Sequence, residues 1–487
     1  MSPVTQKSVL STVPTQLFVG GEWRDSLSAT TFPVHDPATG GVLVEVANGT
    51  VADGEAALDA AVAAQGNWAA TAPRERGEIL RRAFELLTER TDEFAMLMTL
   101  EMGKPLAESR GEVAYAAEFF RWFSEEAVRI HGRYAVNPAG GSRLLTMQKP
   151  VGPTFMITPW NFPLAMGTRK IGPALAAGCT IVVKPAHETP LTMLLLAKTL
   201  DEVGVPSGVL NVITTSQSSD VSEPIIRDPR LRKLTFTGST GIGKKLVEQS
   251  SEQLLRLSME LGGNAPFVVF EDADLDKAVE GAMLAKMRNI GEACTAANRF
   301  IVHASVAEEF GRRFAERMGA LTVGKGTAKG VDVGPLITEK ARTGVAEMVD
   351  EAVAGGATVL TGGEVPTGKG WFYPPTVLTG VAKDARVLRE EIFGPVAPII
   401  TFTTEEQAVE LANSSEYGLV GYVFTQDNAR VIRVAEALEF GMVGVNQGIV
   451  SNPSAPFGGV KHSGYGREGG FEGIEEYLET KYIGIAL

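Results

Sequence analysis

The chain has 487 residues, of which 44% are hydrophobic and 21% charged, so we expect a globular protein with two or more domains. Its net charge of −13 argues against nucleic acid or an anionic membrane surface as the main partner. Two cysteines exclude a disulfide framework, and five scattered histidines show no zinc spacing, so we expect no metal ion.

The N-terminal residues show no signal-peptide pattern. No apolar run in the sequence approaches the ~20 residues of a transmembrane helix, so we expect a cytoplasmic enzyme. Residues 15–50 alternate short apolar runs with turns, which predicts a β segment. Residues 73–101 carry one apolar stripe and predict a helix, and a second helical pattern runs from about 106 to 130. Residues 131–150 are interpreted as a linker or an excursion from the first domain.

From residue 154 onward, short β-rich runs alternate with helical patterns, which is typical of parallel sheets covered by helices on both faces. Ligands on such sheets bind beyond the carboxyl ends of the strands, where Asn161, Lys184, Gly238 and Glu260 fall. The apolar tail 477–487 predicts a strand of the kind that often pairs with the edge of another chain. The other expected strands are Thr154–Thr158, Thr180–Lys184, Val209–Thr214, Leu234–Thr237, Leu255–Glu260, Phe267–Phe270, Arg299–Val302, Val396–Phe402, Leu419–Phe424 and Met442–Asn446.

The two cysteines have different surroundings. Cys179 enters an apolar strand, where a thiol behaves as a small hydrophobic group. Cys294 lies in a small, polar, loop-like stretch, where a substrate can reach a thiol and a thiolate can be stabilised. Either a free surface cysteine or a nucleophile fits this context.

The Gly-rich run Phe236-Thr-Gly238-Ser-Thr-Gly-Ile-Gly243-Lys-Lys245 nearly spells a phosphate loop, which would indicate an ATPase. The motif fails at Lys245, which has no hydroxyl for Mg²⁺. What remains is a Gly-rich helix start suited to a phosphate or pyrophosphate.

Two further residues could serve a reaction at a thiol. Asn161, between Pro159 and Pro163, has its direction fixed by a rigid turn and could donate to an oxyanion, although an ordinary Asx turn is the alternative. Glu260 stands at a strand end, and burial would raise its pKa and suit it to general-base work. The alternative for Glu260 is a solvated turn carboxylate.

Over residues 15–487 the chain resembles the aldehyde dehydrogenase superfamily. The resemblance implies an α/β fold, the aldehyde dehydrogenase fold, with a Rossmann-like cofactor domain, an α/β catalytic domain and a β oligomerisation arm. The motifs that carry it are Pro159–Pro163, Lys184-Pro-Ala186, Phe236–Thr240, Glu260-Leu-Gly-Gly263, Gly291–Cys294, Glu391-Ile-Phe393-Gly-Pro395 and Pro456-Phe-Gly-Gly459.

The resemblance also implies a role for each site residue. Cys294 would be the nucleophile, Glu260 the base for the deacylating water, and Asn161 with the Cys294 N–H the oxyanion hole. The thiolate would add to the aldehyde, a hydride would pass to the nicotinamide, and water would hydrolyse the resulting thioester. The residues expected to bind NAD or NADP are Thr158, Pro159, Trp160, Lys184, Ala186, His187, Gly238, Ser239, Leu261, Glu391 and Phe393.

Three positions look like those that grip the distal carboxylate in the succinate-semialdehyde dehydrogenases, namely Arg169, Arg288 and Ser451. Two arginines flanking a nucleophile from different segments suit bidentate carboxylate binding, whereas a lone arginine is usually a surface charge. One methylene is worth only ~1–3 kcal/mol, so glutarate semialdehyde is an alternative substrate, as are aromatic or longer-chain aldehydes.

The chain departs from the family pattern at two positions. Ala296 replaces a second cysteine found in some members, so a disulfide switch at this position is not expected. NAD-preferring members usually have a glutamate at the position of His187, which here is followed by Glu188. A histidine tolerates a 2′-phosphate, which favours NADP slightly over NAD.

We predict a cofactor-binding domain from residues 1–126 and 151–262, a catalytic domain from 263–465, and an oligomerisation arm from 127–150 and 466–487. The arm would make a homodimer or homotetramer. The leading function is oxidation of succinate semialdehyde to succinate. The phosphate-loop ATPase and a non-catalytic nucleotide-binding scaffold are the alternatives outside this class.

Overall fold

The computed structural model describes residues 4–487, and its largest sheet has eight strands in the order β2-β1-β9-β8-β7-β10-β11-β21. The five strands from β9 to β11 are parallel, which confirms the predicted alternation, and antiparallel strands flank them. The bounds are β1 Leu17–Val19, β2 Glu22–Arg24, β7 Thr154–Ile157, β8 Ile181–Lys184, β9 Leu210–Val212, β10 Lys233–Thr237, β11 Arg256–Glu260 and β21 Gly464–Tyr465.

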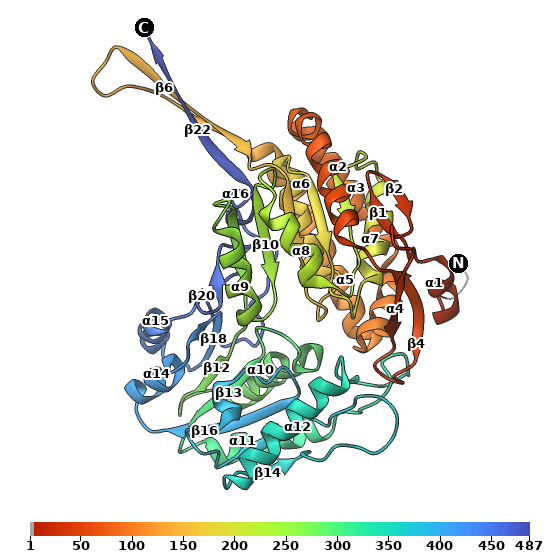
Figure 1. Ribbon diagram of the computed structural model, residues 1–487. Helices are drawn as coiled ribbons and strands as arrows, with labels where there is room; N and C mark the ends of the chain where they lie inside the picture. The colour runs from red at the N-terminus through yellow and green to blue at the C-terminus, as the bar shows by residue number, and fades with distance from the viewer. Residues whose placement is uncertain (1–3) are drawn as a thin grey trace.

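Helices cover both faces of this sheet (Figure 1). Side chains alternate between the faces of a strand, so Phe155 and Met156 of β7 join different hydrophobic clusters. The Met156 side packs against α3, α4, α5, α6 and α7, and the Phe155 side against α2, α8 and α9. The bounds are α1 Gln6–Thr12, α2 Val51–Ala70, α3 Pro73–Glu89, α4 Thr91–Met102, α5 Leu106–Glu126, α6 Ala165–Ala177, α7 Leu191–Glu202, α8 Ser218–Arg227 and α9 Thr240–Ser250.

The helix predicted over residues 73–101 is two helices, because the chain breaks at Arg90 between α3 and α4. The Arg90 guanidinium donates to Thr199 and pairs with Glu202 of α7, so a tertiary contact holds the junction. The second predicted helix, 106–130, ends at Glu126 as α5 and continues as the 3₁₀ turn η1, Ala127–Arg129.

The second large sheet has seven strands in the order β14-β15-β16-β13-β12-β18-β19, all parallel except the edge strand β14. It lies below the first sheet in Figure 1 and carries its own helices. Its strands are β12 Ala265–Val269, β13 Ala297–His303, β14 Thr358–Thr361, β15 Thr376–Thr379, β16 Val396–Phe402, β18 Val420–Phe424 and β19 Met442–Val445. Its helices are α10 Leu275–Met287, α11 Ala307–Gly319, α12 Glu339–Ala354, α13 Arg386–Arg389, α14 Glu405–Asn413 and α15 Asn428–Ala437.

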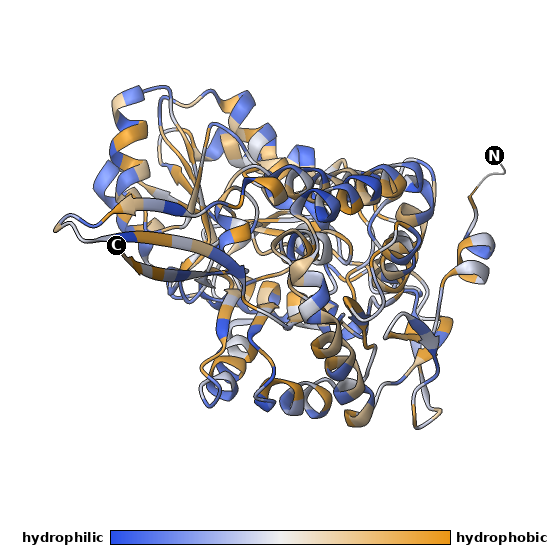
Figure 2. Ribbon diagram, turned by 90° about the horizontal axis from the view of Figure 1, so that it is seen from above, coloured by the Kyte–Doolittle hydropathy of each residue, from blue (hydrophilic) through white to orange (hydrophobic). Residues whose placement is uncertain are grey.

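A three-stranded arm projects from the body (Figure 1). The segment expected to be a linker holds two strands, β5 Arg133–Val136 and β6 Ser142–Pro150. The predicted tail strand is β22, Leu478–Ala486, and it pairs with β6 of its own chain. Hydrophobic and hydrophilic residues both occur along the arm, as Figure 2 shows, and Tyr134 and Tyr482 are 65% and 61% exposed.

Short elements complete the chain. A hairpin joins β3 Thr31–His35 to β4 Val42–Ala47, and β17 Tyr417–Gly418 pairs with β20 Val460–Lys461. The helix α16, Glu472–Glu475, precedes the arm strand β22. The strand β21 of the first sheet comes from the range predicted for the catalytic domain, and the three predicted domain ranges themselves stay a prediction.

Candidate active site

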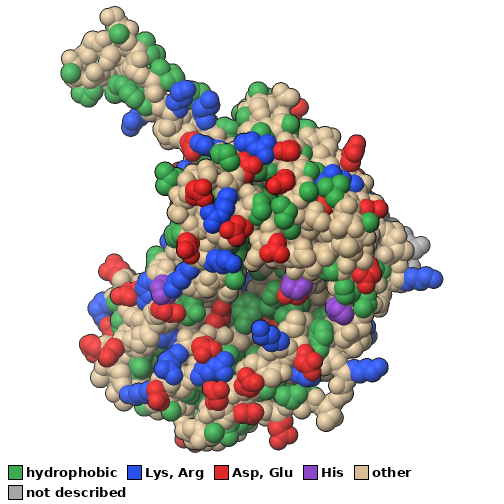
Figure 3. Space-filling model, viewed as in Figure 1, with side chains coloured by type: hydrophobic (Ala, Val, Ile, Leu, Met, Phe, Trp, Pro, Cys, Tyr) green, Lys and Arg blue, Asp and Glu red, His purple; other side chains and the backbone are tan. Residues whose placement is uncertain are grey.

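A pocket of about 230 Å³ lies where the two large sheets meet. Figure 3 shows the molecule hollowed between these two parts, with hydrophobic side chains on the floor of the hollow. The pocket combines strand ends of the first sheet with loops of the second. Its lining residues are Pro159, Trp160, Asn161, Met166, Thr237, Gly238, Ser239, Leu261, Gly262, Cys294, Glu391 and Phe393.

Cys294 is partly exposed in this pocket, whereas the residues on both sides of it are buried. The segment is therefore not the open polar loop expected from its composition, because Ala293 and Ala296 pack into the core beside α6. Burial raises the pKa of the Cys294 thiol to about 12, and the cation of Arg169 opposes this shift. This shift favours the protonated thiol at rest.

The chain enters this segment through η2, Arg288–Gly291, in an unusual conformation. Asn289 and Ile290 have φ values of 54° and 64°, in the left-handed region that a β-branched residue rarely adopts. The side-chain amide of Asn289 donates to the backbone carbonyls of Asn161 and Glu292 at 3.0 and 2.8 Å. The backbone N–H of Asn289 donates to the Glu108 carboxylate. These contacts hold the strained turn in place.

Asn161 is fixed from several sides. Its side-chain amide nitrogen donates to the backbone carbonyl of Glu292 at 3.0 Å. Its backbone carbonyl accepts from Lys104 Nζ at 2.8 Å. An amide nitrogen carries two hydrogens, so one remains for a reacting oxygen in the pocket. The same Glu292 carbonyl also ties Asn161 to the segment that carries Cys294.

Lys104 belongs to a buried ion pair that no motif in the sequence indicated. Its ammonium contacts Glu112 Oε2 at 2.5 Å, and both side chains are 1% exposed. Glu112 Oε1 accepts from the N–H groups of Leu164 and Ala165, at the start of α6. The pair thus supports both the Asn161 turn and the helix that follows it.

Replacing Lys104 with methionine should lower the free energy of unfolding by about 3–5 kcal/mol, because Glu112 would be left as an uncompensated buried charge. Chemical denaturation measures this value. Lys277→Met is the matched control, since Lys277 forms an ion pair with both side chains exposed and should change stability by less than about 1 kcal/mol. Equal effects of the two substitutions would contradict the structural role of Lys104.

Glu260 ends β11 and is buried, and neither carboxylate oxygen has a hydrogen-bond partner within residues 4–487. Burial raises the pKa of Glu260 well above its usual value, and the nearby Glu468 adds to the shift, whereas Arg169 and Lys170 oppose it. Glu260 is therefore not the solvated turn carboxylate of the alternative interpretation. It also lies close enough to Cys294 to influence the thiol electrostatically.

Glu468 is a second carboxylate at this site, and no role for it was inferred from the sequence. It pairs with Arg169 and with Lys170, which are adjacent in α6. Burial acts to raise the pKa of Glu468, but the two cations outweigh it and lower the pKa overall. Glu468 is thus the ionised partner and Glu260 the carboxyl that holds its proton more tightly.

Arg169 is 1% exposed and does not stand free at a pocket mouth. Its guanidinium lies 4.2 Å from the centroid of the Phe457 ring, and its Nε atom faces Glu468. Arg288 is more accessible: it lies over the Phe162 ring, and its Nη1 donates to Ser451 Oγ at 3.2 Å. Arg288 also lines a neighbouring cavity of about 390 Å³. The structure therefore brings the predicted pair Arg288 and Ser451 into contact, near Phe162 beside Asn161.

Four of the residues predicted to bind the cofactor lie outside the 230 Å³ pocket, at or after the ends of β7 and β8, namely Thr158, Lys184, Ala186 and His187. The Thr158 N–H donates to the Lys184 carbonyl, and Lys184 Nζ donates to Ser218 Oγ at 3.1 Å. Burial lowers the pKa of Lys184 to about 8, with Glu188 opposing the shift. Ala186 is half-buried, and His187 is exposed with its Nδ1 atom 3.3 Å from Glu188 Oε2.

The other predicted cofactor residues surround the pocket. Ser239 is the N-cap of α9, and its side chain does not cap the helix, so the first N–H groups remain available to an anion. Phe393, with φ of 49°, packs edge-on against Trp160 at 5.3 Å. Burial raises the pKa of Glu391 to about 7. The Gly263 N–H donates to the Glu391 carboxylate at 3.1 Å, and this hydrogen bond opposes the shift.

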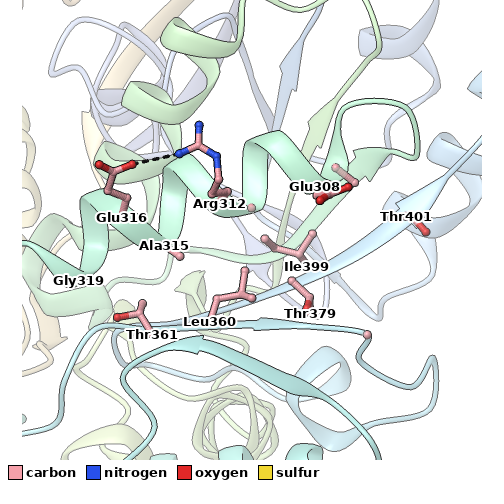
Figure 4. A pocket seen from close by; sticks show the side chains of 13 residues that line it. Glu308, Arg312, Ala315, Glu316, Gly319, Leu360, Thr361, Thr379, Ile399 and Thr401 are labelled. Atoms are coloured by element: carbon pink, nitrogen blue, oxygen red, sulfur yellow. Dashed lines mark hydrogen bonds and ion pairs between the residues drawn. The ribbon is translucent and has the colours of Figure 1, made fainter.

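A larger pocket, of about 740 Å³, lies between α11 and the strands β14, β15 and β16 of the second sheet (Figure 4). Its walls include Ala315, Leu360, Thr361 and Ile399. None of the predicted site residues lines it. We therefore place the chemistry in the smaller pocket that contains Cys294.

Within residues 4–487, no group of three histidine, cysteine, aspartate or glutamate side chains could hold a metal ion. In the same part of the chain, no helix combines the length and the apolar character needed to cross a membrane.

Comparison with known proteins gives a consistent result. Residues 23–483 match the model of the aldehyde dehydrogenase family. The chain is 62% identical to a succinate-semialdehyde dehydrogenase of Paenarthrobacter nicotinovorans over 91% of this chain and 99% of that protein. It is 48% identical to a glutarate-semialdehyde dehydrogenase of Pseudomonas putida over 97% and 98%.

A solved structure described as an NADP-dependent enzyme of E. coli superimposes with a TM-score of 0.97 at 48% identity, covering 99% of both chains. The predicted aldehyde dehydrogenase fold, with its Rossmann-like and catalytic α/β parts, is confirmed. The family and the fold exclude the alternative interpretation of the Gly-rich run 236–245 as the phosphate loop of an ATPase. From its sequence motifs, its fold and its matched length, the chain belongs to the aldehyde dehydrogenase family.

Proposed function

We propose that this protein oxidises succinate semialdehyde to succinate with NAD(P)⁺ and water. The observation that carries the substrate is the contact between Arg288 and Ser451 in a partly buried site near Asn161, with the second arginine, Arg169, in electrostatic reach of Cys294. A guanidinium binds a carboxylate through two parallel hydrogen bonds, which an uncharged aldehyde cannot use. The 62% identity to a succinate-semialdehyde dehydrogenase supports the same substrate.

The residues divide the reaction among them. Cys294 loses its proton and its sulfur adds to the aldehyde carbon, while Asn161 and the Cys294 N–H bind the oxygen that becomes negative. NAD(P)⁺ supplies the acceptor for the hydride that leaves this carbon. Glu260 then takes a proton from water, whose oxygen attacks the thioester and releases the acid and the thiol.

The site fits a nicotinamide cofactor. The uncapped start of α9 at Ser239 suits a pyrophosphate, and Lys184 and Glu391 offer a donor and an acceptor for ribose hydroxyls. Trp160 and Phe393 form an apolar wall beside Cys294 that suits the nicotinamide ring. NADP is slightly favoured over NAD, because an exposed histidine stands at position 187, but the Glu188 carboxylate 3.3 Å away opposes a 2′-phosphate and keeps this preference small. The similarity to an NADP-dependent enzyme supports this preference.

Arg288→Ala should raise KM for succinate semialdehyde about 30-fold or more, the effect of truncating one partner of a partly buried charge pair. kcat/KM for hexanal should change less than threefold, because hexanal has no distal carboxylate. A panel of succinate semialdehyde, glutarate semialdehyde, hexanal and an aromatic aldehyde, each with NAD and NADP, measures both effects by cofactor absorbance. The same panel gives the ratio of kcat/KM with NADP to kcat/KM with NAD, which tests the cofactor preference inferred from His187.

Arg312→Ala is the control for this panel, since Arg312 is exposed on α11, and it should behave like the wild-type protein. If wild-type protein oxidises hexanal as efficiently as succinate semialdehyde, the carboxylate site is excluded and a different aldehyde is the substrate. If glutarate semialdehyde is preferred, the site binds a carboxylate one methylene further from the aldehyde.

We further propose that the arm formed by β5, β6 and β22 makes a homodimer or homotetramer. The strands β5 and β22 carry large apolar side chains that a monomer leaves exposed, and Figure 3 shows hydrophobic groups along the arm. Among these, Tyr134, Val136, Tyr482 and Ile485 would be buried against a second copy. A cytoplasmic location stays a prediction from the composition, as does the absence of nucleic-acid and membrane partners.

A further inference from the structure

Two buried hydrogen-bond donors at the proposed carboxylate site have no partner. They are the Tyr115 hydroxyl and the Nη2 atom of Arg169, each inaccessible to water and without a hydrogen bond to any residue from 4 to 487. A buried polar group without a partner costs about 1–3 kcal/mol, so native proteins keep few of them. Two such donors, one on Arg169 and one on a tyrosine beside Arg288, indicate a ligand with acceptor oxygens.

Tyr115 lies beside Arg288, one of the two arginines that the proposed function assigns to the substrate. Its ring centroid is 5.5 Å from the Arg288 guanidinium carbon, and Arg288 in turn donates to Ser451. Burial lowers the pKa of Arg169, whereas Glu468 and next the Tyr115 phenol raise it, so the phenol oxygen is in electrostatic range of Arg169. A carboxylate held by Arg288 would therefore lie beside the Tyr115 ring, whose hydroxyl is buried and has no hydrogen-bond partner within residues 4–487.

The fold keeps Tyr115 in this position. It stands in the middle of α5, whose neighbouring residue Phe119 packs edge-on against its ring at 5.0 Å. Arg288 approaches the ring from the segment before Cys294, and it lies against Phe162 at 5.0 Å as well. The ring is thus held by aromatic packing, and the hydroxyl plays no part in that packing.

We propose that the Tyr115 hydroxyl donates a hydrogen bond to the distal carboxylate of the substrate and is a determinant of specificity for semialdehydes with a terminal acid. An ionised carboxylate has about four acceptor positions, more than one guanidinium and one serine hydroxyl fill. A neutral donor binds the carboxylate without repelling the two arginines. This inference rests on the proposed function and adds a residue that the sequence motifs did not indicate.

Tyr115→Phe tests the hydroxyl alone, because phenylalanine keeps the ring and its contacts. KM for succinate semialdehyde and the inhibition constant of succinate should both rise about 10- to 100-fold, the range for a hydrogen bond to a charged group. kcat should change less than about threefold, and kcat/KM for hexanal should stay at the wild-type value. Calorimetric titration of the protein with succinate measures the binding loss without turnover.

Tyr373→Phe is the matched control. Like Tyr115, Tyr373 has a buried hydroxyl without a hydrogen-bond partner within residues 4–487, but it packs among Val345, Met348 and Leu378 in the core of the second sheet. Tyr373→Phe should leave KM, kcat and the inhibition constant of succinate at their wild-type values. Any change that it does cause measures the general effect of removing a buried hydroxyl.

Unchanged KM and inhibition constants in Tyr115→Phe would overturn the proposal. Equal losses with succinate semialdehyde and hexanal would also overturn it, because they would show a role in packing rather than in carboxylate binding. Failure of the proposed function is a separate result: it would be seen in the wild-type protein as no preference for succinate semialdehyde over hexanal.

Discussion

Cys294→Ala abolishes aldehyde oxidation, with an expected fall in kcat on the order of 10⁵-fold, because no other group in the 230 Å³ pocket can form a thioester. The pocket itself should survive, since alanine is smaller than cysteine and the neighbouring Ala293 and Ala296 hold the segment in the core. Fluorescence of Trp160 on titration with reduced cofactor measures binding, which should change less than about twofold. Loss of cofactor binding together with activity would contradict a purely chemical role.

Cys179→Ala is the matched control, because Cys179 is fully buried and its Sγ atom faces the Tyr477 carbonyl. It should retain activity and lose at most about 1 kcal/mol of stability. Alkylation of wild-type Cys294 by iodoacetamide should rise about tenfold per pH unit from pH 7 to 10, since the thiolate fraction grows in this way below a pKa of about 12. A rate independent of pH in this range would show that the thiolate already forms at neutral pH.

Glu260→Gln has the second-largest expected effect, a fall in steady-state kcat of about 10²- to 10⁴-fold, the usual contribution of a general base. The first turnover should persist, because Cys294 and Asn161 still form the adduct and release the hydride. Stopped-flow absorbance should therefore show a burst of reduced cofactor equal to the enzyme concentration, followed by a slow phase. Added hydroxylamine, which attacks thioesters without a base, should speed up that slow phase.

The pH dependence of the wild-type slow step follows from the raised pKa of Glu260. A carboxyl with a raised pKa stays protonated, and inactive as a base, to a higher pH than usual, so deacylation should still accelerate with rising pH above the range in which an ordinary carboxyl titrates. Glu260→Gln should lose this dependence. Absence of a burst in the variant would contradict the assignment, because it would mean that Glu260 is required before the thioester forms.

Buried charges form much of this site, and their partners could not be read from sequence order. Glu468 stands 208 positions after Glu260 and meets it only because β21 pairs with the end of β11. Lys104 and Glu112 flank the start of α5, and nothing in their spacing indicates that their pair supports Asn161. Likewise, the break at Arg90 depends on contacts with α7, which a local helical pattern does not contain.

The sequence alone determined the alternating strands, the positions of Asn161, Lys184, Gly238 and Glu260 after strands, and the family, because periodicity and short motifs are local properties of the chain. Tertiary structure alone decided which side chains are buried together. It placed Arg169 against Glu468, left the Tyr115 hydroxyl without a partner, and enclosed the Cys294 segment that composition suggested was an open loop. The physical reason is that desolvation and charge pairing depend on neighbours brought in by the fold, and these set the pKa values on which the chemistry depends.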